Sequence, residues 1–132
     1  MVIRSFTDFE VYQRSYRAMK ICKVEIVEKL PANEKFGLVD QINRACMAIP
    51  RLIAEGYGKK HQKRGFHKYL ADALAESNEM VVSLSQVLEF YGQFVDIIIC
   101  KRLIKTYDVI GKELYRLHQN WRSFDLEVKN EK

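Results

Sequence analysis

Apolar residues recur every three or four positions along four long stretches of this chain, which is the spacing of one face of an α-helix. The stretches predict helices over residues 8–30, 34–57, 63–91 and 96–124, followed by a charged, frayed tail over residues 125–132. The pattern is most regular in the last stretch, at Cys100, Leu103, Tyr107, Ile110, Leu114, Leu117, Trp121 and Phe124. Because the connections are short, neighbouring helices are expected to be antiparallel. Residues 1–132 are therefore predicted to form one all-α domain, an antiparallel up-down four-helix bundle.

Individual residues mark where the predicted helices begin, bend and end. Thr7 and Glu10 have the spacing of a capping box, in which two residues cap each other's backbone N–H groups. Pro31 is expected to end the first helix, and Pro50 to kink the second because it removes one backbone hydrogen bond. Asp96 is a suitable N-cap for the fourth helix.

The composition is that of a folded, soluble protein, with 48% hydrophobic and 30% charged residues. No apolar run approaches the ~20 residues that span a bilayer, and the segment from Met1 to Glu10 lacks the apolar core of a signal peptide. The cysteines, Cys22, Cys46 and Cys100, lie on apolar faces and have no metal-binding or disulfide spacing. These features predict a cytoplasmic protein with buried free thiols and no membrane partner.

The net charge of +5 is concentrated in the connection between the second and third predicted helices. This basic turn, residues 59–68, contains five lysines or arginines and two histidines but no acidic residue. Cations at the start of the third helix oppose its dipole, so their placement costs stability and suggests a use for the charge. Phosphates of RNA or DNA would meet these side chains and the free N–H groups of the first helical turn together. The candidate nucleic-acid-binding residues are Lys59, Lys60, His61, Lys63, Arg64 and Lys68.

Two aromatic residues accompany the basic turn. Tyr57 and Phe66 could offer stacking faces to unpaired bases, which would add to the attraction between the cations and phosphate. The alternative is a solvated turn whose charge has no ligand. The sequence leaves both interpretations open.

A second set of charges lies on the second and third predicted helices. Arg44 and Arg51 are two turns apart on the second helix, and the third carries an acidic stripe at Asp72, Glu76 and Glu79. An ion-pair network within or between helices is the simplest interpretation, and a contact between subunits is the alternative. The residues assigned to these pairs are Arg44, Arg51, Glu55 and Glu76.

No motif for catalysis or cofactor binding occurs in the sequence. It contains no G-x-S-x-G segment, no P-loop and no G-x-G-x-x-G segment, and no glutamate is followed three residues later by a histidine. A small metal or thiol enzyme is a weaker hypothesis, because His61, His67 and His118 share no ligand spacing. The protein is therefore expected to be non-enzymatic and to bind no metal or cofactor.

Short segments along most of the chain resemble one known family. They are Ser5 to Gln13, Leu30-Pro31, Glu34 to Leu38, Gln41-Ile42, Arg44-Ala45, Ile49-Pro50, Ile53 to Lys59, Phe66 and Tyr69-Leu70. In these segments the chain resembles the four-helix-bundle proteins encoded by intervening sequences in bacterial 23S ribosomal RNA genes. The resemblance extends over residues 5–92, and the fourth helix matches in pattern only.

The resemblance implies a protomer that closes into a homopentameric ring. Family relatives include the accessory protein of diversity-generating retroelements, a positively charged pentamer that binds nucleic acid and a reverse transcriptase. Such a ring would present the basic turn five times and so gain avidity for a polyanion. Arg51 and Leu52 stand where the family pattern has Ser-Asn, so no role of those two residues carries over.

Together these features predict a non-enzymatic, oligomeric protein that associates with nucleic acid, with RNA preferred over DNA. It would assist a ribosomal RNA or retroelement ribonucleoprotein, with a reverse transcriptase among its partners. The alternative is an oligomeric scaffold or adaptor that holds a protein partner and binds no nucleic acid.

Overall fold

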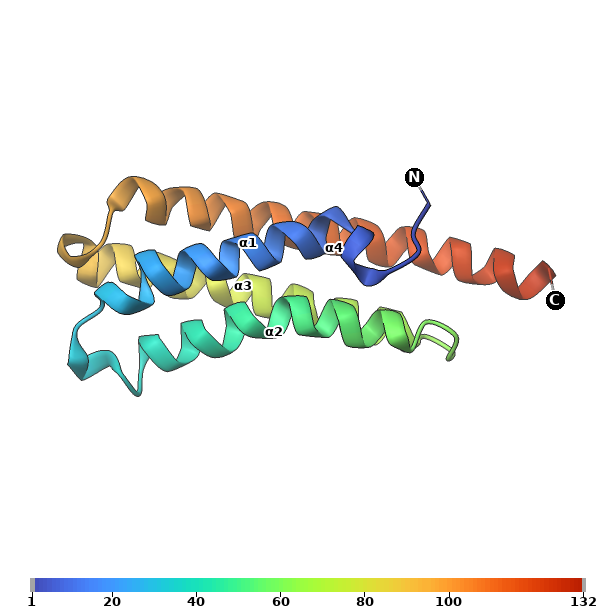
Figure 1. The fold of residues 1–132 in the computed structure, drawn as a ribbon, viewed down its shortest axis with the longest axis horizontal. Helices are drawn as coiled ribbons and strands as arrows, with labels where there is room; N and C mark the ends of the chain where they lie inside the picture. The colour runs from blue at the N-terminus through green and yellow to red at the C-terminus, as the bar shows by residue number, and fades with distance from the viewer. Residues whose placement is uncertain (1, 132) are drawn as a thin grey trace.

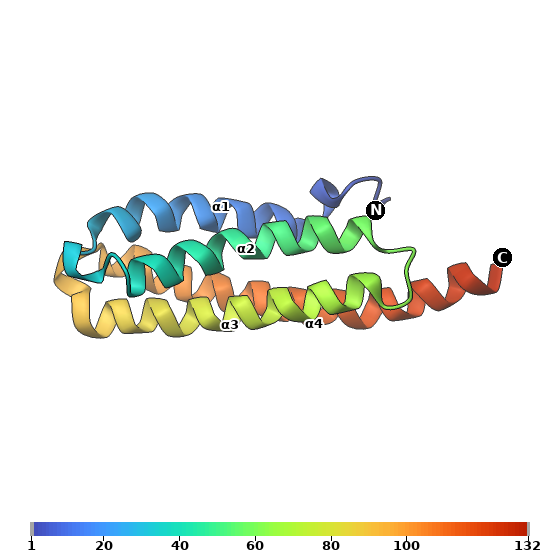
Figure 2. The ribbon, with the colours of Figure 1, turned by 90° about the horizontal axis from the view of Figure 1, so that it is seen from below.

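The computed structural model describes the backbone of residues 2–131 and the side chains of residues 2–121. Long helices and no strand occur within this backbone, and they run up and down along one axis (Figure 1; Figure 2). The helices are α1 (Glu10–Glu25), α2 (Leu38–Gly58), α3 (Gly65–Tyr91) and α4 (Ile97–Glu131). The prediction of an all-α, up-down four-helix bundle is confirmed.

Each helix packs against two neighbours, so the bundle is square in cross-section, with α4 returning to lie against α1. The apolar faces of all four helices meet in one core. Its largest fully buried side chains are Ile26, Ile42, Ile49, Ile53, Phe66, Leu70, Met80, Leu84, Val87, Tyr107, Ile110 and Leu114. Within the described backbone, no helix is both long enough and apolar enough to cross a membrane.

The three cysteines lie in this core. Cys22, Cys46 and Cys100 are all buried and form no disulfide, as their apolar positions predicted. Burial raises the pKa of the Cys22 thiol to about 12 and that of Cys46 to about 11. Because the thiolate is the reactive form, both thiols are unreactive at neutral pH.

The N-terminal cap differs from the predicted one. Asp8 pairs with Ser5 instead of Glu10 pairing with Thr7: the backbone N–H of Ser5 donates to the Asp8 carboxylate at 3.0 Å, and the Ser5 hydroxyl accepts from the N–H of Thr7 at 3.3 Å. This capping box closes the 3-10 turn η1 (Phe6–Asp8). Phe9 is extended, so α1 starts only after it.

The first helix is shorter than the predicted 8–30. After α1 the chain forms two 3-10 turns, η2 (Val27–Lys29) and η3 (Ala32–Glu34), on either side of Pro31. The backbone at Ile26 has already left regular helical geometry (φ −117°, ψ −64°). Apolar spacing continues through this segment because its side chains still face the core, which explains why the periodicity predicted a longer helix.

The second helix begins at Leu38, four residues after the predicted start at Glu34. The Glu34 carboxylate lies in front of the helix, where it accepts the backbone N–H of Leu38 at 3.1 Å and the hydroxyl of Tyr91. These hydrogen bonds, chiefly the one from Tyr91, hold the pKa of Glu34 below its usual range. Helix α2 then continues through the buried Pro50, and the kink there stays a prediction.

The remaining boundaries follow local capping chemistry. Asp96 caps α4 as predicted, because its carboxylate accepts the N–H groups of Ile98 at 3.0 Å and Ile99 at 3.2 Å. Helix α4 continues to Glu131, past the predicted end at residue 124, and the fraying of residues 125–132 stays a prediction. The side chain of Phe124, the last predicted seam position, lies outside the described residues.

Candidate nucleic-acid interface

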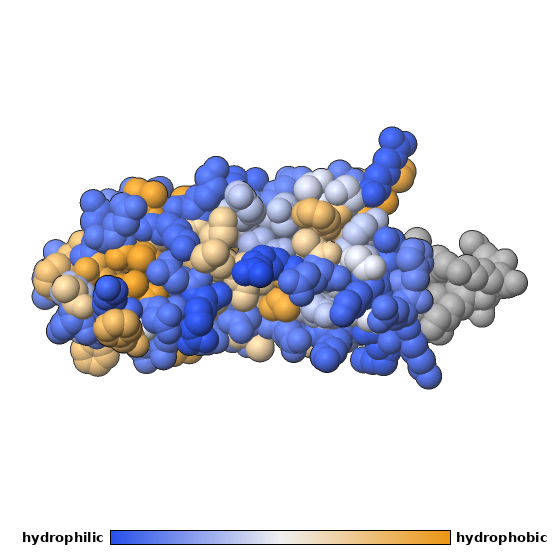
Figure 3. Space-filling view, turned by 60° about the horizontal axis from the view of Figure 1, so that its bottom comes forward, coloured by the Kyte–Doolittle hydropathy of each residue, from blue (hydrophilic) through white to orange (hydrophobic). Residues whose placement is uncertain are grey.

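The bundle has two chemically different ends. The connection between α2 and α3, which carries the basic turn, lies at the same end as the N-terminal segment (Figure 1; Figure 2). Hydrophilic side chains cover much of this end in Figure 3, whereas apolar surface gathers toward the opposite end. The exposed apolar side chains of the segments at that opposite end are Phe36, Phe90, Phe94, Ile97 and Ile98.

Two backbone hydrogen bonds close the basic turn. The N–H of Gln62 donates to the carbonyl of Lys59 at 3.0 Å, and the N–H of Gly65 donates to that of Gln62 at 2.9 Å. A Cβ atom at Gly65 would lie 2.0 Å from the backbone oxygen of Lys59, so only glycine fits this close approach. Arg64 precedes it in the left-handed region (φ 57°), which delays the start of α3 from the predicted residue 63 to Gly65.

A cluster of four aromatic rings packs inside the bundle next to the basic turn. Phe9, Tyr57, Phe66 and Trp121 come from the N-terminal segment, α2, α3 and α4, and their ring centroids lie 5.0 to 6.3 Å apart. Most of these pairs meet edge to face, which is a favoured aromatic geometry. This aromatic cluster ties the basic turn to three other elements and fixes its position on the bundle.

The structure divides the six candidate residues into two groups. Lys59, His61, Lys63, Arg64 and Lys68 are exposed, and Lys60 is half-buried. Lys59 donates to the hydroxyl of Tyr69 at 2.8 Å, with its ammonium 5.1 Å from the ring centroid. The ammonium of Lys60 lies 4.1 Å from the centroid of the Tyr57 ring.

These contacts correct the prediction that two aromatic residues offer stacking faces. Phe66 is only 1% exposed and belongs to the core, and the partly buried Tyr57 has Lys60 over its ring. The hydrogen bond to Tyr69 raises the pKa of Lys59, so this cation keeps its charge over the whole neutral range. Sequence reasoning does not find Tyr69 as a polar partner, because the contact joins residues ten positions apart across the turn.

His67 belongs to the basic segment in sequence but not in space. It is buried, and its ring meets that of His118 on α4 at a centroid distance of 5.0 Å. Its position next to Phe66 on the inward face of α3 explains the burial. Among the described residues, no three histidine, cysteine or acidic side chains converge on a point that could hold a metal ion.

The second predicted set, Arg44, Arg51, Glu55 and Glu76, lines an open groove between α2 and α3. This α2–α3 groove has a volume of about 660 Å³, and Asp72, Met47 and Leu52 also line it. Arg44 pairs with Asp40 on its own helix at 3.3 Å, which is the intrahelical alternative. Within the described side chains, the four predicted residues form no ion pair with one another, so an interhelical network does not form there.

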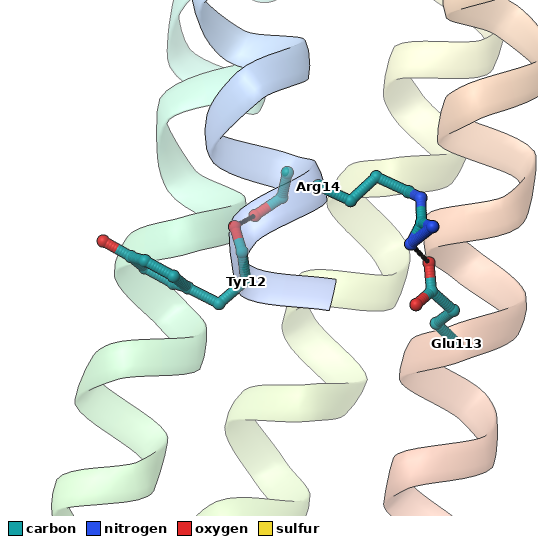
Figure 4. Close-up of polar contacts among 4 residues, drawn as sticks. Tyr12, Arg14 and Glu113 are labelled. Atoms are coloured by element: carbon teal, nitrogen blue, oxygen red, sulfur yellow. Dashed lines mark hydrogen bonds and ion pairs between the residues drawn. The ribbon is translucent and has the colours of Figure 1, made fainter. Parts of the chain in front are cut away.

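Among the described side chains, one ion pair joins two helices, and the sequence did not predict it. Arg14 of α1 reaches Glu113 of α4 at 2.8 Å, as Figure 4 shows. Near Arg14, the hydroxyl of Ser15 donates to the carbonyl of Tyr12 at 2.9 Å within α1. The two ion-paired residues are 99 positions apart in the chain, so no local pattern could pair them.

The carboxyl of Glu76 in the groove is unfavourably placed. Partial burial raises its pKa, and the nearby carboxyl of Glu79 raises it further. We therefore expect Glu76→Gln to stabilise the protein by about 0.5 kcal/mol at pH 7, a small value because the site is largely solvated. The gain should disappear below about pH 4, where the carboxyl is protonated in both the folded and the unfolded protein.

Urea unfolding at pH 7 and at low pH measures this difference. The exposed Glu89→Gln on the same helix is a matched control and should leave the midpoint unchanged at both pH values. An equal effect of Glu76→Gln at both pH values, or a loss of stability at pH 7, would show that the ionised carboxyl is not destabilising.

Comparison with known proteins places the chain in a family. No curated protein matches the sequence. The family described as 23S rRNA-intervening sequence protein matches residues 7–119, which covers α1, α2, α3 and most of α4. The matched region also contains the basic turn and the α2–α3 groove, so both surfaces lie within the family's own domain. The chain therefore belongs to the 23S rRNA-intervening sequence protein family.

Proposed function

We propose that this protein is a non-enzymatic, oligomeric protein that binds the phosphate backbone of nucleic acid, RNA above all, through its basic turn. The observation that carries the proposal is the set of exposed cations Lys59, Lys63, Arg64 and Lys68 on a closed turn without an acidic residue. The ammonium of Lys60, at the ring of Tyr57, adds a fifth positive group. Binding to the phosphate backbone of a nucleic acid requires only such cations, in a position that phosphates can reach.

The energetic cost of this arrangement supports a ligand. Helix α3 begins without a side-chain cap, and no acidic residue lies in its first turn. The backbone of Arg64 is in the left-handed conformation, which is unfavourable by about 1–2 kcal/mol for a residue other than glycine. A phosphate at the turn would relieve the repulsion between the cations and the positive end of the helix dipole.

Removing the cations tests the proposal. The affinity for a structured RNA, measured by fluorescence anisotropy, should fall as the salt concentration rises. In a plot of log K against log salt concentration, each phosphate contact should contribute a slope of about −0.7 to −0.9. Replacing Lys59, Lys60, Lys63 and Arg64 with alanine should make this slope shallower by about three. The variant should stay folded, because it removes charge that opposes the dipole of α3.

A charge-matched control separates the site from net charge. Replacing the exposed lysines Lys29, Lys35, Lys101 and Lys105, which lie toward the other end of the bundle, removes the same total charge. This control should retain most of the affinity and the parental slope. Equal losses in both variants, or full binding by the basic-turn variant, would contradict the assignment.

Assembly multiplies the basic turn in this proposal. Ile21 and Val24 of α1 are about half-exposed beside a mostly apolar groove of about 520 Å³ between α1 and α4, a surface suited to a subunit contact. A ring, pentameric by the family resemblance, would bind a polyanion through several turns at once. Light scattering should give a multiple of the 15.6 kDa chain mass, and a monomer would remove this avidity.

The cellular setting follows from the same proposal. The protein would work in the bacterial cytoplasm on a ribosomal RNA or retroelement ribonucleoprotein, with a reverse transcriptase as a protein partner in the second case. The genomic neighbourhood distinguishes the two: the reading frame would lie inside a ribosomal RNA gene or beside a reverse transcriptase gene.

A scaffold for a protein partner is the second candidate, and the α2–α3 groove favours it. The groove has a partly apolar floor at Met47 and Leu52, with the cations Arg44 and Arg51 on the α2 side and an acidic α3 side. An amphipathic helix with charges of both signs would fit such a surface. Two results together would support this candidate. The protein would bind neither RNA nor DNA at low salt, and a pull-down would recover one protein whose binding is lost in the Arg51→Glu variant.

A further inference from the structure

We infer that the basic turn recognises double-stranded nucleic acid, RNA duplex above all, and not unpaired bases. The inference rests on the proposed function and names the class of ligand for the same surface. Its basis is the juxtaposition of exposed cations on one closed turn with neighbouring phenylalanine and tyrosine rings that are buried or contacted by a lysine.

The aromatic rings near the turn are not available to bases. Single-stranded recognition modules stack successive bases on exposed aromatic faces, and each stacked base contributes about 1–3 kcal/mol. Here Phe66 lies in the core, the ammonium of Lys60 lies 4.1 Å from the ring centroid of Tyr57, and the ammonium of Lys59 is held at the hydroxyl of Tyr69. A base that stacked on this face of Tyr57 would have to displace Lys60 and its cation–π contact.

One exposed ring remains within the turn, the imidazole of His61. A single ring can stack at most one base, whereas RNA-binding sheets of known modules stack two or three. Stacking would therefore contribute little compared with the five positive groups around it. The surface is left with electrostatic attraction as its main source of affinity.

A surface of this kind favours the ligand with the higher density of phosphate charge. A duplex carries one negative charge for about each 1.7 Å of its axis, because two strands contribute. Arg64 immediately precedes α3 and Lys68 lies in its first turn, where the Lys68 N–H donates to the Arg64 carbonyl at 3.3 Å; the Gln62 and Gly65 hydrogen bonds close the turn before them. The backbone that carries these cations is thus already ordered, so little backbone entropy is lost when they meet the regularly spaced phosphates of a duplex.

The experiment compares three labelled RNAs of equal length: a 16-base-pair duplex, one of its strands chosen to be unstructured, and oligouridine. Fluorescence anisotropy at low salt should show the duplex bound at least about fivefold more tightly than either single strand. The salt slope for the duplex should be near 0.9 per contact, against 0.7 for single strands. Duplexes of different sequence should bind alike, since backbone contacts do not read bases.

Two neighbouring variants sharpen the result. Lys63→Ala should weaken duplex binding and make its salt slope shallower by about one contact, or 0.9. His61→Ala, which removes the exposed ring, should leave the preference for duplex unchanged. Both side chains are exposed, so neither change should unfold the protein.

The outcomes separate the two levels of the proposal. The duplex inference is overturned if either single strand binds as tightly as the duplex. It is also overturned if the parent prefers single strands and His61→Ala selectively abolishes that binding. In both cases the proposed function stands. If none of the three RNAs binds at low salt, the proposed function fails together with the inference.

Discussion

Phe66→Ala should lower the free energy of unfolding by about 3–5 kcal/mol, the range for truncating a buried phenylalanine. Phe66 is 1% exposed. The centroid of its ring lies 5.0 Å from the ring centroid of Trp121, 5.8 Å from that of Phe9 and 5.9 Å from that of Tyr57. The change would leave a cavity where four elements meet and would remove three aromatic contacts at once. Urea or guanidinium unfolding, followed by circular dichroism, measures the loss.

Phe36→Ala is the matched control, because the same side chain is removed from an exposed position. Phe36 is 89% exposed, and its contact with the ammonium of Lys35 spans 5.6 Å. We expect its unfolding midpoint to stay within the range of a neutral surface change, about 0.5 kcal/mol. Similar losses in the two variants would show that the aromatic cluster does not hold the basic end of the bundle together.

Gly56→Ala should destabilise the protein by about 1–3 kcal/mol through overpacking. An added Cβ would lie 2.5 Å from the Cβ of Tyr69 and 2.9 Å from the Cδ1 of Phe66, both on α3. Neither atom is the tip of a flexible side chain, so α2 and α3 would have to move apart. Because Tyr69 also accepts the hydrogen bond from Lys59, this movement should weaken nucleic-acid binding as well.

Gly58→Ala, two residues later in the same helix, should have the opposite sign. A Cβ atom there meets nothing within 4 Å, and no glycine of the described chain has a positive φ. Alanine is favoured over glycine in a helix by up to about 1 kcal/mol, so this variant should be slightly stabilised. A thermal or urea melt of the pair tests the contrast, which would be lost if both changes shifted the midpoint in the same direction.

Gly56 gives a physical reason for one part of the family resemblance. In the segment from Ile53 to Lys59, Ile53 is buried in the core and Gly56 allows α3 to approach closely. Arg51 and Leu52, where the family pattern has Ser-Asn, line the α2–α3 groove instead. The departure from the pattern therefore falls on the open groove, away from the close contact between α2 and α3 at Gly56.

Local sequence patterns are sufficient to predict the class of fold. Regular apolar spacing encodes which side of each helix is buried, and this spacing correctly predicted four helices, the α4 seam from Cys100 to Leu114 and the buried free thiols. It also predicted the Asp96 cap, because a cap is a contact between residues only two or three positions apart. Features of this kind are local, so the order of residues is enough to find them.

The construction of the site depends on contacts between elements. Packing of the helices buries Phe66 among rings from three other elements and places Lys59 at the hydroxyl of Tyr69 and Lys60 over the ring of Tyr57. It also joins Glu34, in front of α2, to Tyr91 from the far end of α3. It also paired Arg14 with Glu113, and it brought Arg51 and Glu76 to one groove without pairing them. These contacts join residues on different elements, and their geometry is set by how the helices pack, which periodicity along a single helix does not encode.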